Sequence, residues 1–299
     1  MTGSRFVRLC LALLVTAAGH VVVSSLDEGE SVLATAMQRN LRSRIVGGSV
    51  ANKKRYPYFT RLEFISYNSK TSMQSTGYCG GTLIDKNVVL TAAHCVIPPQ
   101  GYKVQSITAY VNATSQDTLR KPNSGYHHIR IASQSCVHRY YDAVTLFSDV
   151  AVVFLDKSID TKVVTPAKIN GNANIPADGQ SVTAIGLGAT DNYQAFPKDL
   201  LEVSVSIIDG SVCEKRYILN EFYDLYQICA GGTKGTWHGD SGGPLLLKGT
   251  GASKDVVVGI TSYGVFSAPG AFARASMYGY WVQDRVYDYN HNITKTMCK

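Results

Sequence analysis

Three short segments carry side chains that together could perform nucleophilic catalysis. A serine, Ser241, stands in the glycine-rich run Gly239-Asp-Ser-Gly-Gly-Pro244. A histidine, His94, lies in Thr91-Ala-Ala-His-Cys95, and an aspartate, Asp149, precedes an apolar run. A serine hydroxyl needs a base to take its proton, an imidazole can be that base, and a carboxylate can orient the imidazole. The segments therefore predict a site with Ser241 as nucleophile, His94 as general base and Asp149 as the orienting acid.

Each of these residues also has an ordinary structural interpretation. A lone aspartate before an apolar strand is usually a turn residue, and a glycine-rich run is often only a loop. The coincidence of all three motifs with Arg44-Ile-Val-Gly-Gly48, in one order along the chain, favours catalysis over that alternative. A lone histidine is usually structural or superficial, and we interpret the six others in this way: His20, His127, His128, His138, His238 and His291.

In this order and spacing the motifs resemble those of the chymotrypsin-like serine peptidases, from Ile45 to roughly Val286. The resemblance implies an all-β fold of two antiparallel six-stranded Greek-key β-barrels with a C-terminal helix, and an active site between the barrels. It implies an endopeptidase that acts on a protein or peptide substrate through an acyl-enzyme intermediate, with no cofactor and no metal ion. A lipase or esterase fits poorly, because the serine motif is not Gly-x-Ser-x-Gly.

The distribution of apolar residues favours an all-β fold independently of these motifs. Short runs with strand character are separated by glycine, proline, asparagine and aspartate at fairly regular intervals. The pattern also predicts a closing helix at Tyr278–Tyr289, and the resemblance implies a crossover between the barrels at Lys157–Asn170. The expected strands are 59–65, 81–84, 88–90, 107–111, 129–132, 150–155, 182–185, 200–207, 244–247 and 256–263.

The N-terminal part of the chain differs in character from the rest. Arg5 and Arg8 precede a short apolar run, a pattern typical of a secretory signal, so residues 1–25 are expected to be a signal peptide. A membrane anchor is the alternative, since Val21–Val23 extends the apolar stretch. Residues 26–44 then form an activation pro-segment and residues 45–299 the peptidase domain. We expect a secreted, extracellular protein.

The resemblance assigns an activation switch to Arg44, Ile45 and Asp240. Cleavage after Arg44 frees the α-amino group of Ile45, and the new ammonium pairs with Asp240 beside the nucleophile. A buried carboxylate without a partner is costly, so the loop of Asp240 should stay misaligned until the pair forms. The chain is therefore expected to be a zymogen, with an upstream Arg-specific peptidase as a partner. The alternative is that Ile-Val-Gly-Gly merely begins a strand.

Cysteine usage agrees with export. The chain has seven cysteines, of which Cys10 lies in the expected signal peptide, and the remaining even number predicts disulfides. Their spacing alone leaves the connectivity open. The resemblance implies two pairs and leaves a third by elimination, so we expect Cys79–Cys95, Cys213–Cys229 and Cys136–Cys298.

The formal net charge is +7, but the basic residues are scattered, apart from the cluster Lys53-Lys54-Arg55. A solvated surface explains this pattern better than nucleic-acid binding does. No segment after the signal is apolar enough to cross a bilayer, so we expect no membrane partner, and we expect a monomer. The sequons at Asn112 and Asn292 predict glycosylation of an exported protein, and are otherwise ordinary surface asparagines.

The resemblance also assigns the groups around the reacting carbonyl. The N–H groups of Gly239 and Ser241 form the oxyanion hole, and Ser262 hydrogen-bonds Asp149. The substrate-binding residues are expected to be Gly235, Thr236, Ser262, Tyr263, Gly264 and Gly270.

Gly235 stands where trypsin-like members carry an aspartate that pairs with Lys or Arg, and no acid lies between Cys229 and Asp240. A basic P1 side chain would be buried unpaired, which predicts large apolar or aromatic P1 residues instead. Lys234 could attract an acidic P1 residue, although a solvated loop lysine is the simpler interpretation. Trp237 replaces a cysteine beside the pocket and could obstruct it. The alternative function is a catalytically weak or inactive homologue that acts as a binding protein or hydrolase inhibitor.

Overall fold

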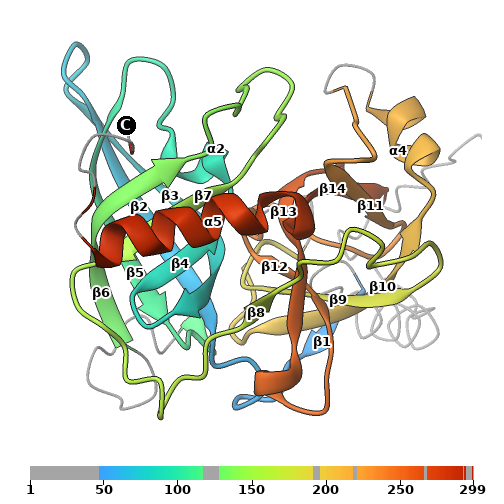
Figure 1. Ribbon diagram of the computed structural model, residues 1–299. Coiled ribbons are helices and arrows are strands. Elements are labelled where there is room, and N and C mark those ends of the chain that lie inside the picture. The colour runs from blue at the N-terminus through green and yellow to red at the C-terminus, as the bar shows by residue number, and fades with distance from the viewer. Residues whose placement is uncertain are drawn as a thin grey trace, which may run out of the picture. The chain divides into compact units, whose positions relative to one another are not determined.

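Short β-strands close into two barrels that lie side by side (Figure 1). The computed structural model describes residues 47–116, 128–190, 196–217, 221–265, 268–291, 293 and 298. All of them belong to one unit, Ser43–Lys299. The expected signal peptide and pro-segment, with Arg44 and Ile45, lie outside the described residues, as does Asn292 of the second sequon.

The first barrel closes in the order β2-β3-β4-β7-β6-β5. Its strands are β2 (Phe59–Asn68), β3 (Met73–Asp85), β4 (Val88–Thr91), β5 (Lys103–Val111), β6 (His128–Val137) and β7 (Ala151–Leu155). β4 and β7 read Val-Val-Leu-Thr and Ala-Val-Val-Phe-Leu, and every residue in both is buried. Continuous apolar runs of this length are typical of fully buried strands, which explains why the sequence located both.

The second barrel closes through the pairing of its first two strands, β9 and β10. Its strands are β9 (Ser181–Gly186), β10 (Leu201–Ile208), β11 (Gln227–Gly231), β12 (Pro244–Leu247), β13 (Val256–Tyr263) and β14 (Pro269–Arg274). Short β1 (Ser49–Val50) joins β10, and β8 (Lys168–Ile169), within the expected crossover, runs parallel to β13. From Leu201 to Ile207, β10 alternates apolar and polar residues, with the apolar ones buried, as a strand with one face on the core must. The expected all-β fold of two six-stranded barrels is confirmed.

A C-terminal helix, α5 (Ala275–Asn290), begins beside β13 and runs across the front of the first barrel (Figure 1). It follows β14 of the second barrel and reaches the first, where the Tyr289 ring stacks on Phe154 at a centroid distance of 4.1 Å. The Tyr289 hydroxyl also lies 2.8 Å from Ser133 Oγ. The shorter helices are α2 (Ala93–Val96), α4 (Gly210–Arg216) and the 3-10 turn η1 (Ala252–Lys254). None of the helices within the described ranges is long and apolar enough to span a membrane.

In the part of the chain that the structure describes, three disulfides join segments that are distant in sequence or enclose a loop. They are Cys79–Cys95, Cys213–Cys229 and Cys136–Cys298, the expected pairs. The last of these ties β6 of the first barrel to the residue near the C-terminus. Cys79–Cys95 links β3 to α2, the helix that carries His94, and so restrains the position of that helix.

The sequence prediction omitted four strands: β1, β8, β11 and β14. β14 begins Pro-Gly and contains two alanines, and β11 reads Gln-Ile-Cys-Ala-Gly. β14 has no β-branched residue and β11 has only Ile228, so neither shows the enrichment in such residues that marks a strand. Each is stabilised by its neighbours, since β11 pairs with β10 and β14 and β14 pairs with β13.

Candidate active site

The pairing of β4 with β7 brings His94 and Asp149 together. Thr91 lies opposite Ala151 in this antiparallel register, so α2, which follows β4, lies beside the turn that precedes β7. His94 Nδ1 is 2.7 Å from Asp149 Oδ2, and the His94 backbone N–H donates to Asp149 Oδ1 at 2.9 Å. The carboxylate therefore holds both the ring and the backbone of the histidine.

The second barrel supplies another donor to the same carboxylate. Ser262, near the end of β13, donates from Oγ to Asp149 Oδ2 at 2.5 Å. Asp149 is only 1% exposed, and these donors compensate for the removal of its charge from water. Ser148, directly before it, has φ +52°, a conformation that non-glycine residues adopt at an energetic cost. The turn before β7 thus carries backbone strain beside the carboxylate.

Two opposing effects act on the imidazole of His94. Burial lowers the pKa of His94, whereas the negative charge of Asp149 and the hydrogen bond to it raise the pKa. The net result is a pKa above the usual 6.5. The carboxylate thus favours the protonated imidazole, which is the form that a base reaches when it has taken a proton.

The loop that carries Ser241 is tied to both barrels. The N–H of Gly80 in β3 donates to the Ser241 carbonyl at 2.7 Å, and the N–H of Gly242 donates to the Thr261 carbonyl in β13 at 2.8 Å. Gly239 has φ +91°, a conformation open to glycine but unfavourable for other residues. Within the described residues, the N–H groups of Gly239 and Ser241 have no hydrogen-bond acceptor. Both donors are therefore available to a developing oxyanion.

Asp240, next to Ser241, is a fully buried carboxylate. Its Oδ1 accepts from the Gly188 N–H at 2.8 Å and its Oδ2 from the Trp237 N–H at 2.9 Å. Burial raises the pKa of Asp240 to about 6, against the opposing effects of these two N–H donors and of the positive charge of Arg61. Among the described residues no cation forms an ion pair with Asp240.

Two glycines that the sequence did not mark form the cradle around this carboxylate. A Cβ at Gly186 would overlap Asp240 Oδ1, and a Cβ at Gly188 would lie 2.5 Å from Asp240 Cγ and 2.6 Å from Asp240 N. Neither position can therefore carry a side chain while Asp240 stays in place. The run Gly186-Leu-Gly188 is the only sequence signal for this cradle. It does not identify Asp240, the residue that the glycines contact, because Asp240 lies more than fifty positions away from Gly188.

We expect Gly188→Ala to displace Asp240 and with it the loop that holds Gly239 and Ser241. Overpacking of this kind costs about 1–3 kcal/mol of stability, and a small misplacement of reacting groups lowers kcat/KM by about tenfold to a hundredfold. The matched control is Gly171→Ala, because a Cβ at Gly171 meets nothing within 4 Å. Thermal unfolding and peptide hydrolysis by both variants test this, and equal activity of the two would show that the cradle has no catalytic importance.

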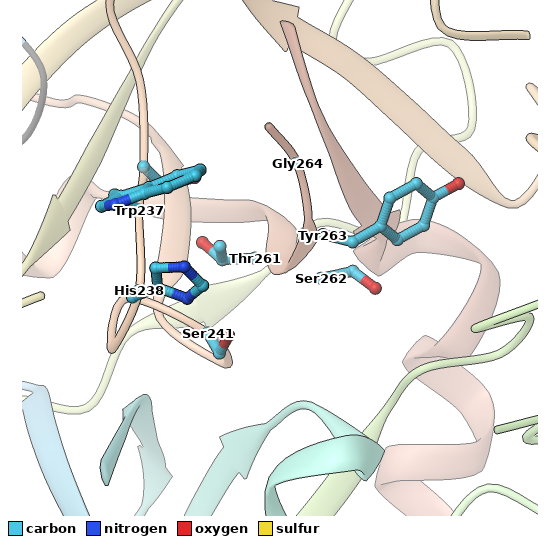
Figure 2. Close-up of a pocket in the computed structure, with 8 residues that line it drawn as sticks. Trp237, His238, Ser241, Thr261, Ser262, Tyr263 and Gly264 are labelled. Carbon is cyan, nitrogen blue, oxygen red and sulfur yellow. The ribbon is translucent and has the colours of Figure 1, made fainter. Parts of the chain in front are cut away.

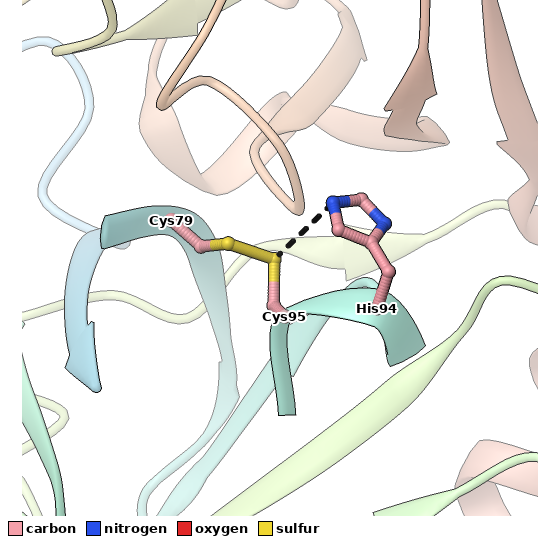
Figure 3. A group of neighbouring side chains, drawn as sticks. All are labelled: Cys79, His94 and Cys95. Carbon is pink, nitrogen blue, oxygen red and sulfur yellow. Dashed lines mark hydrogen bonds between the residues drawn. A yellow bond between two sulfur atoms is a disulfide. The ribbon is translucent and has the colours of Figure 1, made fainter. Parts of the chain in front are cut away.

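The disulfide Cys79–Cys95 lies against the imidazole of His94, with Cys95 Sγ 3.8 Å from Nε2 (Figure 3). These three residues are the one group in the described part of the chain with metal-ligand types close together. Thiolates rather than disulfide sulfurs bind metals, so the group does not fit a metal ion.

In the described residues no hydrogen bond joins His94 Nε2 to Ser241 Oγ. Proton transfer between them requires a closer approach.

A cavity of about 210 Å³ opens beside Ser241. Figure 2 shows Trp237 and His238 on one side of it and Tyr263 on the other. The Trp237 and His238 rings pack together with centroids 4.4 Å apart. The lining residues are Thr236, Trp237, His238, Ser241, Thr261, Ser262, Tyr263 and Gly264. Four of the six expected substrate-binding residues are among them.

Comparison with known proteins identifies the family. A family model described as Trypsin matches residues 45–282. The chain belongs to the trypsin family. It is 33% identical over 257 residues to trypsin, alkaline C, of Manduca sexta, which covers 81% of this chain and 90% of that protein. It is 30% identical over 247 residues to chymotrypsin-2 of Vespa crabro, which covers 80% and 98%.

A solved structure, that of a protein called GrC, superposes with a TM-score of 0.66 at 26% sequence identity, over 81% of this chain and 99% of that one. Two residues of the present chain that were expected to bind substrate, Gly235 and Gly270, are not among the residues that line the cavity beside Ser241. Gly270 lies on β14, against Gly264. His238 lines the cavity, although nothing in the local sequence separated it from the other histidines. Thr261 also lines it and was not predicted.

Proposed function

We propose that this trypsin-family serine endopeptidase acts through His94, Asp149 and Ser241. The observation that carries the proposal is the convergence on one buried carboxylate of a histidine from the first barrel and a serine from the second, beside the loop of Ser241. No single barrel supplies this arrangement. A purely structural turn would not need donors from both.

In the proposed reaction, neutral His94 takes the proton of Ser241 Oγ as the hydroxyl attacks the substrate carbonyl. Asp149 accepts from Nδ1–H and stabilises the imidazolium that forms. The Gly239 and Ser241 N–H groups bind the oxyanion, where one such donor is typically worth about 3–4 kcal/mol. His94 then gives its proton to the leaving amine, and water hydrolyses the acyl-enzyme by the same steps.

We propose a preference for large P1 side chains that carry no charge. None of the described residues that line the cavity is an aspartate, glutamate, lysine or arginine, so a charged P1 side chain would have to be buried unpaired. Apolar and aromatic side chains gain roughly 1.5–3 kcal/mol on full burial.

Cleavage of a P1-randomised peptide pool by the form that begins at Ile45 tests both parts of this proposal. We expect cuts after large uncharged residues, Phe, Tyr, Leu and Met among them, and all of these cuts should be absent with Ser241→Ala. A pattern of cuts after Lys or Arg would overturn the proposed preference and leave the catalytic proposal intact.

The pH dependence of kcat/KM should report the protonation of the His94 imidazole. A protonated imidazole cannot accept the serine proton, so activity falls as pH decreases through the raised pKa of His94. The midpoint is expected above 6.5, the usual value for histidine. A profile that is flat between pH 5 and pH 8 would exclude His94 as the base.

We propose that the protein is exported and made as a zymogen that an Arg-specific peptidase cleaves after Arg44. The zymogen proposal is supported by Asp240, a buried carboxylate in a backbone cradle without an ion-pair partner among the described residues. The freed ammonium of Ile45 would supply that partner. Arg44→Gln is expected to remain uncut and at least about a hundredfold less active than the cleaved enzyme, since the missing pair is worth several kcal/mol. Equal hydrolysis by the uncut variant would remove the switch from the account.

The two forms should also differ in the pH dependence of their stability. In the uncut chain the pKa of Asp240 is raised from 3.8 to about 6, so its favourable contribution is present below pH 3.8 and is lost as pH rises through 6. The loss amounts to about 3 kcal/mol. In the cut form the new ion pair lowers that pKa and reverses the dependence. Calorimetry at pH 4 and pH 7.5 should therefore show that cleavage raises Tm by several degrees at the higher pH and much less at the lower.

Two observations favour a second candidate function, a binding protein or hydrolase inhibitor without turnover. The described residues contain no hydrogen bond between His94 and Ser241, and the Trp237 ring forms part of the cavity wall. If the form that begins at Ile45 binds peptides but neither cleaves them nor reacts with serine-directed reagents, this second function is favoured.

A further inference from the structure

The hydroxyl groups around the cavity differ in whether they already have a partner. Ser262 donates to Asp149, and the Tyr263 hydroxyl accepts from Gln227 Nε2 at 3.3 Å. Thr236 is partly exposed, so solvent can reach it. Thr261 is only 6% exposed, and its Oγ1 has no hydrogen-bond partner among the described residues. One of the residues that line the cavity thus has a buried hydroxyl without a partner, close to Ser241.

The backbone fixes Thr261 at the cavity wall. Its N–H donates to the Gly243 carbonyl at 2.9 Å, and its carbonyl accepts from the Gly242 N–H at 2.8 Å. Both partners directly follow Ser241, so the side chain of Thr261 is positioned relative to the nucleophile by the same hydrogen bonds. Figure 2 shows its hydroxyl on the side that faces Trp237 and His238.

An unpaired buried hydroxyl destabilises a protein unless a ligand group pairs with it. Valine has nearly the same shape and would line a purely apolar pocket without that penalty. A threonine at this position therefore indicates that a polar group enters the cavity in the working state. The group that enters a cavity beside a nucleophilic serine is the substrate side chain next to the bond that is cut.

We propose that Thr261 is a specificity-determining residue whose hydroxyl hydrogen-bonds a neutral polar group on the P1 side chain. This inference rests on the proposed function and refines its P1 preference. The chemical class is a side chain with an apolar body and a neutral hydrogen-bonding end, such as tyrosine or glutamine. The aromatic rings of Trp237 and Tyr263 at the cavity suit the apolar body. The lack of a charged lining group among the described residues disfavours a charged end.

The test compares P1 residues of matched shape, Tyr with Phe and Gln with Met, in otherwise identical peptides. With the form that begins at Ile45, we expect kcat/KM to favour Tyr and Gln by about tenfold or more, because a site built to pair with a polar group rejects the analogue that lacks it. Thr261→Val should bring both ratios close to one, and Thr261→Ser should retain the preference. The control, Thr250→Val, changes an exposed threonine and should leave the ratios unchanged.

If Thr261→Val does not fold, the wild-type ratios and the Thr261→Ser variant still decide the question. Ratios near one in the wild-type protein, or ratios that Thr261→Val does not alter, would overturn the inference.

Binding of the same peptides to Ser241→Ala separates this inference from the proposed function. Absence of all cleavage by the wild-type form would contradict the proposed function alone. Tighter binding of the Tyr and Gln peptides would then still support the role of Thr261, and equal binding of each matched pair would contradict it.

Discussion

Replacing Ser241 with alanine is expected to lower kcat by about five to six orders of magnitude in the form that begins at Ile45. The change removes the only atom that could form the acyl-enzyme in the proposed reaction. Alanine is smaller than serine and leaves the cavity open, so KM should change little. Steady-state hydrolysis of a peptide with an aromatic P1 residue measures both constants.

The matched control for this prediction is Ser253→Ala. Ser253 is exposed in η1 and lies in the same barrel, so its hydroxyl can be removed without a change at the cavity. We expect wild-type kinetics from the control. A loss of less than tenfold for Ser241→Ala would mean that another group performs the nucleophilic attack.

The second large effect is expected for Asp149→Asn, which should lower kcat by about 10⁴ at neutral pH. An amide cannot accept from the His94 backbone, the His94 ring and Ser262 at once, as the carboxylate does. Its NH₂ group would instead require an acceptor, which selects the wrong tautomer of the imidazole. Removal of the negative charge also removes the cause of the raised pKa of His94.

A pH profile distinguishes this explanation from simple misfolding. The midpoint of any residual activity of Asp149→Asn should move to lower pH than in the wild-type protein, because the imidazole loses its charged partner. Asp284→Asn, at an exposed position of α5, serves as the control and should change neither kcat nor the midpoint. An unchanged midpoint in Asp149→Asn would contradict the proposed role of the carboxylate.

Much of the fold could be predicted because the local sequence pattern of many strands is sufficient to identify them. β4, β7, β10 and β13 carry β-branched and apolar residues in runs or alternation, and the sequence located all of them. β11 and β14 depend on their neighbours in the sheet rather than on their own composition. A prediction from local pattern misses such strands for that reason.

In the candidate site too, residues in local sequence motifs could be predicted and residues that depend on distant contacts could not. His94, Asp149 and Ser241 stand in motifs that can be read in order, and the structure joins His94 to Asp149 directly. The cradle of Gly186 and Gly188 depends on contacts between distant segments, which a single sequence does not reveal.

The cavity beside Ser241 could not be predicted from the sequence for the same reason. Whether Thr261 and His238 line it depends on how the loop before Ser241 folds against β13. Among seven histidines, nothing in the local sequence separates His238 from those on the surface. The chemistry was therefore easier to predict than the substrate.

The most direct test of the account is the site of reaction with a serine-directed fluorophosphonate, located by mass spectrometry of the form that begins at Ile45. The account predicts a single adduct on Ser241, lost in Ser241→Ala and strongly slowed in Asp149→Asn. Absence of an adduct on correctly folded and cleaved protein, or an adduct on another serine, would contradict the assignment of Ser241 as the nucleophile.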